Sequence, residues 1–294
     1  MRLAIDRLSK SYGPVAAVRE LSFTAEPGRV CGFLGPNGSG KTTTLRCMFG
    51  LVRPDAGGAT FDGRAYAQLR DPITHVGALL DPDAHHPDRT GREHLRVLCD
   101  AAALPLSRAD EALRLVELEP AANRRAGGYS LGMRQRLHLA AALLGDPAAL
   151  VLDEPANGLD PQGIRWLRDR LRALAAEGRC VLLSSHVLAE VRQTVDDVVV
   201  IAEGRRVAAG TLGDVLATDG SALRVRSPEP AAVRALAERL GGAASGRDGT
   251  LDVRGVGVET FARAAFDARV LLTLIEEREP DLERRYFELT GDRS

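Results

Sequence analysis

A glycine-rich segment near the start of the chain has the residue types and spacing of a phosphate-binding loop. It follows the apolar run 30–34 and consists of Gly35, Pro36, Asn37, Gly38, Ser39, Gly40, Lys41, Thr42 and Thr43. Its glycines allow backbone conformations that residues with a Cβ avoid, so successive N–H groups can turn toward an anion. Lys41 can reach the β- and γ-phosphates of a nucleotide, and the hydroxyl of Thr42 can ligate Mg²⁺. The sequence therefore predicts a P-loop.

Two later apolar segments end in polar residues that suit nucleotide hydrolysis. The run 149–152 is followed by Asp153 and Glu154, and the strand expected at 179–183, apolar from Cys180 onward, leads to His186. The carboxyl ends of strands are where α/β sheets bind their ligands. There, Asp153 can hold Mg²⁺, mainly through water, and Glu154 can orient or polarise the attacking water. His186 can donate a hydrogen bond to the γ-phosphate.

Other side chains that could take part in binding or chemistry give weaker indications of function. Tyr12 precedes the P-loop by the length of a hairpin and could stack on a purine base, or it could belong to the core or to a surface pair. The cysteines show no metal-ligand spacing, and their apolar surroundings predict reduced core thiols at Cys31, Cys47, Cys99 and Cys180. His85 and His86 are expected to lie in a solvated loop, because adjacent histidines lack the spacing of metal ligands.

Composition limits the class of protein. The 294 residues are 45% hydrophobic and 27% charged, as in soluble globular proteins. The net charge of -1 argues against a broad nucleic-acid surface. An acidic residue, Asp6, comes too early for a signal peptide, and no apolar run approaches ~18 residues. We therefore expect a cytosolic chain that would work at a membrane only through a partner.

The elements that must position these residues alternate between strand and helix. Strands are expected at 2–8, 17–25, 30–34, 75–80, 149–152, 179–183, 197–201 and 205–208. Helices are expected after the P-loop and at 91–103, 107–118, 132–144, 161–177 and 187–194. The tail reads as strand 222–226, helix 229–240, strands 243–246 and 250–254, helix 257–267, strand 269–275 and helix 281–289. Its β-α-β-β-α-β order predicts a small ferredoxin-like domain.

In their order and spacing, these motifs resemble those of ABC-transporter ATPases. Five segments are similar to the Walker A, signature, Walker B, D-loop and switch histidine of that family: Gly35–Thr43, Tyr129–Arg136, Asp153–Glu154, Asn157–Asp160 and His186. Tyr12 matches the aromatic residue of the family's adenine loop. The resemblance covers about residues 2–215.

The resemblance implies a fold and a domain organisation. The fold is an α/β P-loop NTPase (RecA-like) core with an antiparallel β subdomain and a helical signature subdomain, followed by a small α+β domain. The implied nucleotide-binding domain spans 1–217, with its helical subdomain at about 84–146, and a C-terminal accessory or regulatory domain spans 218–294.

The resemblance also implies partners and a cofactor. Two nucleotide-binding domains meet head to tail, most simply as a homodimer, with ATP and Mg²⁺ between them. Ser130 and Gly132 of the signature would contact the γ-phosphate in trans, and Asp160 of the D-loop would lie at the same site. A separately encoded transmembrane permease would hold the pair at the cytoplasmic face of the membrane.

Two departures from the family pattern are visible. The signature reads YSLGM, which keeps the serine and the second glycine of the usual LSGGQ. Asp81 stands where the family usually has the Q-loop glutamine, and a carboxylate can ligate Mg²⁺ through water but cannot donate as an amide does. Together with the tail segment 281–291, these features look like the bacterial drug- and antibiotic-export subgroup.

Three functions compete at this point. The favoured one is the ATPase subunit of a membrane exporter. A soluble ABC-type ATPase that acts on a ribosome or nucleic-acid complex is the alternative, but the chain carries one motif set and no basic excess. A regulatory protein that merely senses ATP is disfavoured, because both Glu154 and His186 are present.

Overall fold

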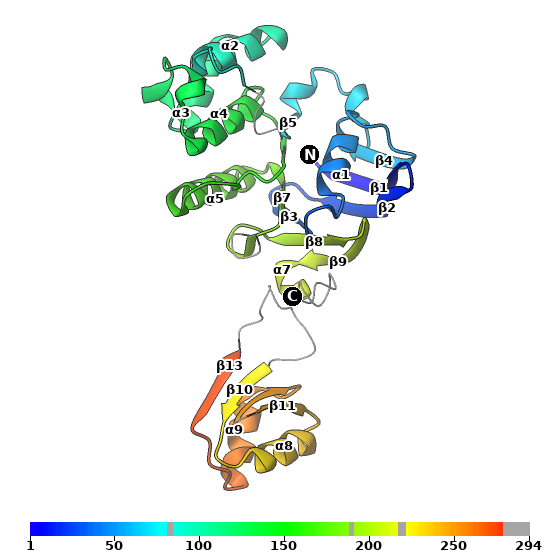
Figure 1. The fold of residues 1–294 in the computed structure, drawn as a ribbon, viewed down its shortest axis with the longest axis vertical. Helices are drawn as coiled ribbons and strands as arrows, with labels where there is room; N and C mark the ends of the chain where they lie inside the picture. The colour runs from blue at the N-terminus through cyan, green and yellow to red at the C-terminus, as the bar shows by residue number, and fades with distance from the viewer. Residues whose placement is uncertain (81–84, 188–190, 217–221, 248, 279–294) are drawn as a thin grey trace. The chain divides into compact units, whose positions relative to one another are not determined.

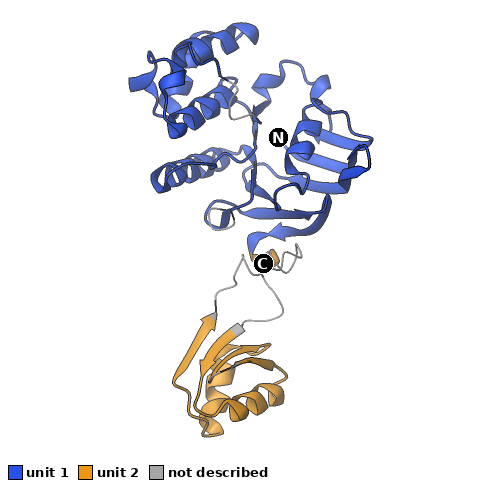
Figure 2. Cartoon of the chain, in the orientation of Figure 1, with its two compact units in different colours: residues 1–212, 289–294 blue, residues 213–288 orange. Residues whose placement is uncertain are grey.

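The computed structural model describes residues 1–80, 85–187, 191–216, 222–247 and 249–278. Within these ranges the chain forms two compact units, one made by Met1–Leu212 and the other within Gly213–Glu288 (Figure 2). In the described ranges, no helix combines the length and the apolar character that crossing a membrane requires.

A six-stranded sheet forms the centre of the first unit. Its strand order is β5 (Val76–Leu79), β6 (Ala149–Leu152), β7 (Cys180–Ser185), β3 (Val30–Leu34), β8 (Asp197–Ala202) and β9 (Arg205–Thr211). Neighbouring strands are parallel except β8 and β9, which are antiparallel. Every residue of β3, β6 and β7 is buried, as expected for parallel strands covered on both faces. The carboxyl ends of these three strands therefore lie side by side.

A second, antiparallel sheet packs on the core through aromatic residues. It consists of β2 (Val15–Ala25), β1 (Leu3–Tyr12) and β4 (Ala56–Phe61), in that order. Its hydrophobic residues join those of β3 and α1 (Lys41–Met48) in one buried cluster. The rings of Phe23 and Phe33 lie 5.0 Å apart and tie the two sheets together.

Helices form the remainder of the first unit (Figure 1). A helical lobe contains α2 (Gly91–Ala101), α3 (Ser107–Leu115) and α4 (Leu131–Leu143), and α5 (Pro161–Ala176) follows β6. Among the residues that the structure describes, short 3₁₀ turns are found at Tyr66–Gln68, Pro72–Thr74, Glu119–Ala121 and Ala126–Gly128. Thr90 and Glu93 form a capping box at the start of α2, with Thr90 Oγ1 accepting from the Glu93 N–H.

The second unit has the predicted β-α-β-β-α-β order. Its elements are β10 (Ala222–Arg226), α8 (Pro230–Arg239), β11 (Ala243–Arg247), β12 (Thr250–Arg254), α9 (Val258–Asp267) and β13 (Leu274–Arg278). The strand order β11-β12-β10-β13 is antiparallel throughout, as in ferredoxin-like domains. The short helix α7 (Leu212–Leu216) lies at the boundary between the units. The second unit has a hydrophobic cluster of its own, which includes Leu223, Val225 and Phe261.

The last described strand differs from the sequence expectation. It was expected at 269–275, but β13 begins at Leu274. Arg269 takes a φ of 54°, and the N–H of Val270 donates to the carbonyl of Ala265, so these residues terminate α9 instead. The expected helix 281–289 and the middle of the expected helix 187–194 lie outside the described residues.

Candidate functional site

The P-loop connects β3 to α1 through a tight turn whose glycines are required by geometry. Gly40 adopts a φ of 104°, and a Cβ on it would lie 2.3 Å from the carbonyl oxygen of Ala17. A Cβ on Gly35 would lie 2.6 Å from the carbonyl oxygen of Ile201. Gly38 has a φ of 79° but faces open space. The first N–H groups of α1 have no intrahelical acceptors, so this turn presents a helix N-terminus to an anion.

Lys41 is the buried cation of this loop. Its side chain is only 5% exposed, and its ammonium group donates to the carbonyl of Gly35 at 2.7 Å and of Pro36 at 3.2 Å. The same group lies 3.5 Å from Oε1 of Glu154. The nearby Ser39 Oγ is buried and has no hydrogen-bond partner among the described residues. A buried ammonium on neutral carbonyls and an unpartnered hydroxyl fit a phosphate group at this position.

Asp153 lies next to Thr42 although 111 positions separate them in the sequence. Thr42 Oγ1 donates to Asp153 Oδ2 at 2.7 Å, so two of the three residues predicted to ligate Mg²⁺ are brought together. Within the described ranges, no group of three or more His, Cys, Asp or Glu side chains could hold a metal alone. The donor set of one hydroxyl and one carboxylate fits Mg²⁺ that completes its shell with phosphate oxygens and water.

Glu154 lies between Lys41 and the histidine at the end of β7. Its Oε2 is 2.5 Å from Nδ1 of His186, while Oε1 faces Lys41. An ionised carboxylate only accepts hydrogen bonds, so Nδ1 of His186 carries the proton in this contact. The Glu154 backbone takes a φ of 49°, and its N–H donates to Ser184 Oγ at 2.8 Å. Lys41, Glu154 and His186 therefore form one cluster at the ends of neighbouring strands.

Sequence reasoning missed the role of Ser184 in this cluster. Its hydroxyl donates to Asp153 Oδ1 and accepts from the N–H of Glu154. The signal in the sequence was a pair of hydroxyl residues directly before His186, which by itself does not identify the one that faces the carboxylates.

Tyr12 lies at the end of β1 with half of its surface exposed, at 50%. It is therefore not a core residue. The ammonium of Lys10 lies 5.5 Å from the ring centroid and pairs with Asp55 at 3.0 Å. The hydrogen bond from Lys10 lowers the pKa of Asp55, with help from the N–H of Ser11.

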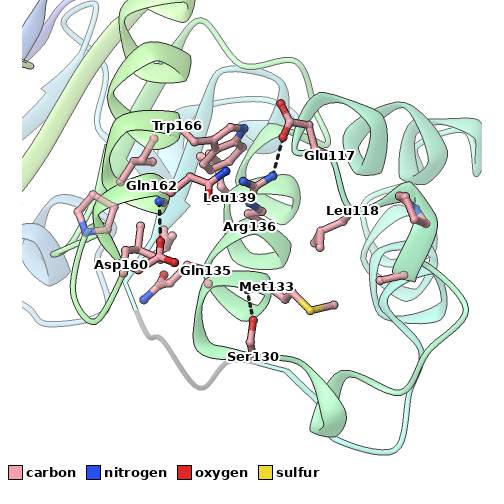
Figure 3. A pocket seen from close by; sticks show the side chains of 18 residues that line it. Glu117, Leu118, Ser130, Met133, Gln135, Arg136, Leu139, Asp160, Gln162 and Trp166 are labelled. Carbon is pink, nitrogen blue, oxygen red and sulfur yellow. Dashed lines mark hydrogen bonds and ion pairs between the residues drawn. The ribbon is translucent and has the colours of Figure 1, made fainter.

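The signature residues lie at a second pocket, of about 370 Å³, between α4 and α5 (Figure 3). Ser130 caps α4 by accepting from the N–H of Met133 at 3.3 Å, and Asp160 caps α5 by accepting from the N–H of Gly163 at 2.7 Å. Ser130, Gly132 and Asp160 all line this pocket, whereas no P-loop residue does. The structure thus places Lys41, Thr42, Asp153, Glu154 and His186 in one group and the predicted signature and D-loop residues in another.

Packing inside this pocket is held by Arg136 and Trp166, as Figure 3 shows. The guanidinium carbon of Arg136 lies 4.0 Å from the Trp166 ring centroid, and its NH1 donates to Glu117 Oε2 at 2.8 Å. The hydrogen bond from Arg136 holds the pKa of Glu117 below its usual value. Tyr129, the first signature residue, is buried and donates to the carbonyl of Ala121 at 2.8 Å, so it serves the fold of the helical lobe.

The remaining predictions concern the cysteines, the loop at His85 and His86, and Asp81. The thiols of Cys31, Cys47, Cys99 and Cys180 are all free and buried, as expected, and burial raises the pKa of Cys180 to about 12. The solvated loop expected around His85 and His86 is confirmed for His86, which is exposed, while His85 is half-buried and its Nδ1 lies 3.1 Å from Nε2 of His138. Asp81, a predicted Mg²⁺ ligand, lies outside the described residues.

A P-loop with a buried lysine after β3, paired carboxylates after β6 and a histidine after β7 define a P-loop ATPase of the α/β class. Comparison with known proteins gives the family. The ABC transporter family profile matches residues 18–157. The chain is 38% identical over 245 residues to the Nod factor export ATP-binding protein I of Paraburkholderia xenovorans, covering 79% of each chain.

Two further comparisons agree. The bacitracin transport ATP-binding protein BcrA of Bacillus licheniformis is 38% identical over 67% of this chain and 66% of its own length. A solved ATP-binding subunit of an ABC transporter superposes with a TM-score of 0.66 and 29% identity, over 73% of this chain and 92% of that one. The chain therefore belongs to the family of ABC-transporter ATP-binding proteins, which hydrolyse ATP to drive transport. The resemblance and the fold class predicted from the sequence are confirmed.

Proposed function

We propose that this chain is the ATP-hydrolysing subunit of a membrane exporter of the drug or antibiotic type. The observation that carries the proposal is the cluster of Lys41, Glu154 and His186 at the ends of β3, β6 and β7. The subgroup is supported by the relatives, whose names describe Nod factor export and bacitracin transport.

In this proposal, the P-loop N–H groups and Lys41 bind the β- and γ-phosphates of ATP, and Tyr12 stacks on adenine. Glu154 orients the attacking water and accepts its proton, while His186 fixes the Glu154 carboxylate and faces the γ-phosphate. Mg²⁺ would be held by Thr42, by Asp153 through water and by Asp81, and would neutralise charge on the phosphates.

A complete site requires a second copy of the chain. Ser130, Gly132 and Asp160 line a pocket that contains no P-loop residue, so they are available to a nucleotide on another protomer. Ser130 caps the N-terminus of α4, which suits a γ-phosphate. ATP would close a head-to-tail homodimer, and hydrolysis would open it.

The closing and opening of the dimer would drive a conformational change in a separately encoded transmembrane permease. The ATPase would then be a peripheral protein at the cytoplasmic face of the membrane. We assign residues 1–217 to the nucleotide-binding domain and 218–294 to an accessory domain that regulates it. The independent hydrophobic cluster around Leu223 and Phe261 supports this division.

The test begins with the adjacent reading frames: any that encodes a hydrophobic protein with several spanning segments is coexpressed with this chain. Wild-type chain should copurify with that protein in detergent, and vesicles containing both should hydrolyse ATP. Lys41→Ala is the matched control, since it should retain the complex and lose hydrolysis. An active ATPase that binds no membrane protein but cosediments with ribosomes would favour the non-transport alternative.

A further inference from the structure

The position of Ser184 beside the acidic residues is set by the register between β6 and β7. It is fully buried in β7, which lies between β6 and β3 in the sheet. Leu152, the last residue of β6, is level with Leu183 of β7, and the residues that follow these two are Asp153 and Ser184. The hydroxyl of Ser184 therefore lies next to the two acidic residues that directly follow β6.

The direction of the two hydrogen bonds at Ser184 follows from the chemistry of its partners. The Asp153 carboxylate can only accept, so the Ser184 hydroxyl donates its proton toward Asp153 Oδ1. A lone pair of the same oxygen then accepts the N–H of Glu154 at 2.8 Å. One hydroxyl thus connects the side chain of one acidic residue to the backbone of the next.

This connection fixes a backbone that is otherwise unfavourable. Glu154 has a φ of 49°, a left-handed conformation that residues other than glycine rarely adopt. That conformation sends the Glu154 carboxylate toward Lys41 and His186. The other oxygen of Asp153 accepts from Thr42, the predicted Mg²⁺ ligand.

We propose that Ser184 is a positioning residue for ATP hydrolysis. Its hydroxyl holds Asp153 in the orientation that serves Mg²⁺ and holds the Glu154 backbone in the orientation that serves the attacking water. The inference rests on the proposed roles of Asp153 and Glu154, and it adds a residue that touches neither nucleotide nor metal. When Thr42 turns toward Mg²⁺, the bond from Ser184 remains to orient Asp153.

The surroundings of Ser184 allow an isosteric test. A small cavity of about 30 Å³ borders Ser184 together with Pro155, Ala156 and Val191. That space suits one additional methyl group, and a β-branched side chain is favourable in a strand. Ser184→Thr and Ser184→Val therefore have the same shape and differ only in the hydroxyl, with Ser184→Thr as the rescuing variant.

The expected result separates positioning from folding. Ser184→Val should lower kcat by about 10- to 100-fold, the range expected for a lost hydrogen bond to a charged group, and Ser184→Thr should stay within about threefold of wild type. Affinity for ATP in EDTA should be equal in both variants, because neither changes the P-loop. The Mg²⁺ concentration for half-maximal rate should rise in Ser184→Val alone. Equal thermal melting curves of the two variants would exclude a folding effect.

Two outcomes distinguish the inference from the function on which it rests. Equal kcat and equal Mg²⁺ requirement in Ser184→Val and Ser184→Thr would overturn the role of Ser184 while leaving the ATPase assignment intact. Wild-type turnover in Glu154→Gln would instead overturn the proposed function. In the double variant with Glu154→Gln, Ser184→Val should add less than its single effect, because both changes act on one group.

Discussion

Glu154→Gln should separate nucleotide binding from hydrolysis. The amide has the shape of the carboxylate, and the N–H of Glu154 can still donate to Ser184. What is lost is the negative charge that lies 3.5 Å from the Lys41 ammonium and 2.5 Å from His186. The amide also cannot accept a proton from water, so the change removes the proposed base with little disturbance of the fold.

The magnitude follows from two separate effects. Loss of general-base catalysis lowers kcat by about 10²- to 10⁴-fold, or about 3–5 kcal/mol in barrier height. At an effective dielectric constant of about 20, charges 3.5 Å apart attract by at most ~5 kcal/mol, and exposure of Glu154 to solvent reduces this value. Because ATP competes with this carboxylate for Lys41, the variant should bind ATP at least as tightly as wild type.

The assay is paired. Binding of a fluorescent ATP analogue is measured by titration, and phosphate release is measured under saturating MgATP. Glu177→Gln is the control, since Glu177 pairs with Arg179 on the surface and lies away from the cluster. Turnover of Glu154→Gln within a few-fold of wild type would refute the assignment of Glu154, and so would a large loss of ATP affinity.

Two further predictions concern the glycines of the P-loop and the stacking of Tyr12 on the adenine ring. Gly40→Ala should destabilise the protein well beyond Gly38→Ala, which should cost about 1–2 kcal/mol. Both glycines have a positive φ, but of the two it is Gly40 whose new Cβ would lie 2.3 Å from a backbone oxygen. Urea denaturation checks this pair, and equal midpoints would show that the close approach of Ala17 is not rigid. Tyr12→Ala should weaken ATP binding by about 1–3 kcal/mol while Tyr12→Phe retains it, because stacking needs only the ring. Unchanged affinity in Tyr12→Ala, measured by the same titration, would remove Tyr12 from the site.

Much of the site was accessible from sequence because it follows from local rules. A glycine turn between an apolar strand and a helix specifies the P-loop, and acidic residues after a short apolar run mark a strand end. These rules also place His186 at the same end of the sheet as Asp153 and Glu154, since the carboxyl ends of parallel strands lie on the same side. The predicted helices and strands around them differ from the structure mainly by a few residues at their ends.

What sequence could not give depends on contacts across strands. The order β6-β7-β3 determines that Asp153 faces Thr42 and that Ser184, rather than Ser185, reaches the carboxylates. The left-handed backbone of Glu154 carries no local signal, because the residue is not glycine. The contact between His85 and His138 likewise joins positions 53 apart, which loop composition cannot reveal.

In the proposed function, each ATP lies between the P-loop of one chain and the signature residues of a second copy of the chain. The most direct test is the solution mass of Glu154→Gln, measured by light scattering with and without MgATP. We expect a mass of one chain, 31.4 kDa, without nucleotide and twice that value with it. Adding Ser130→Glu should abolish the doubling while ATP still binds, since that carboxylate would repel the γ-phosphate. A Glu154→Gln chain that binds MgATP and remains at 31.4 kDa would contradict the composite site.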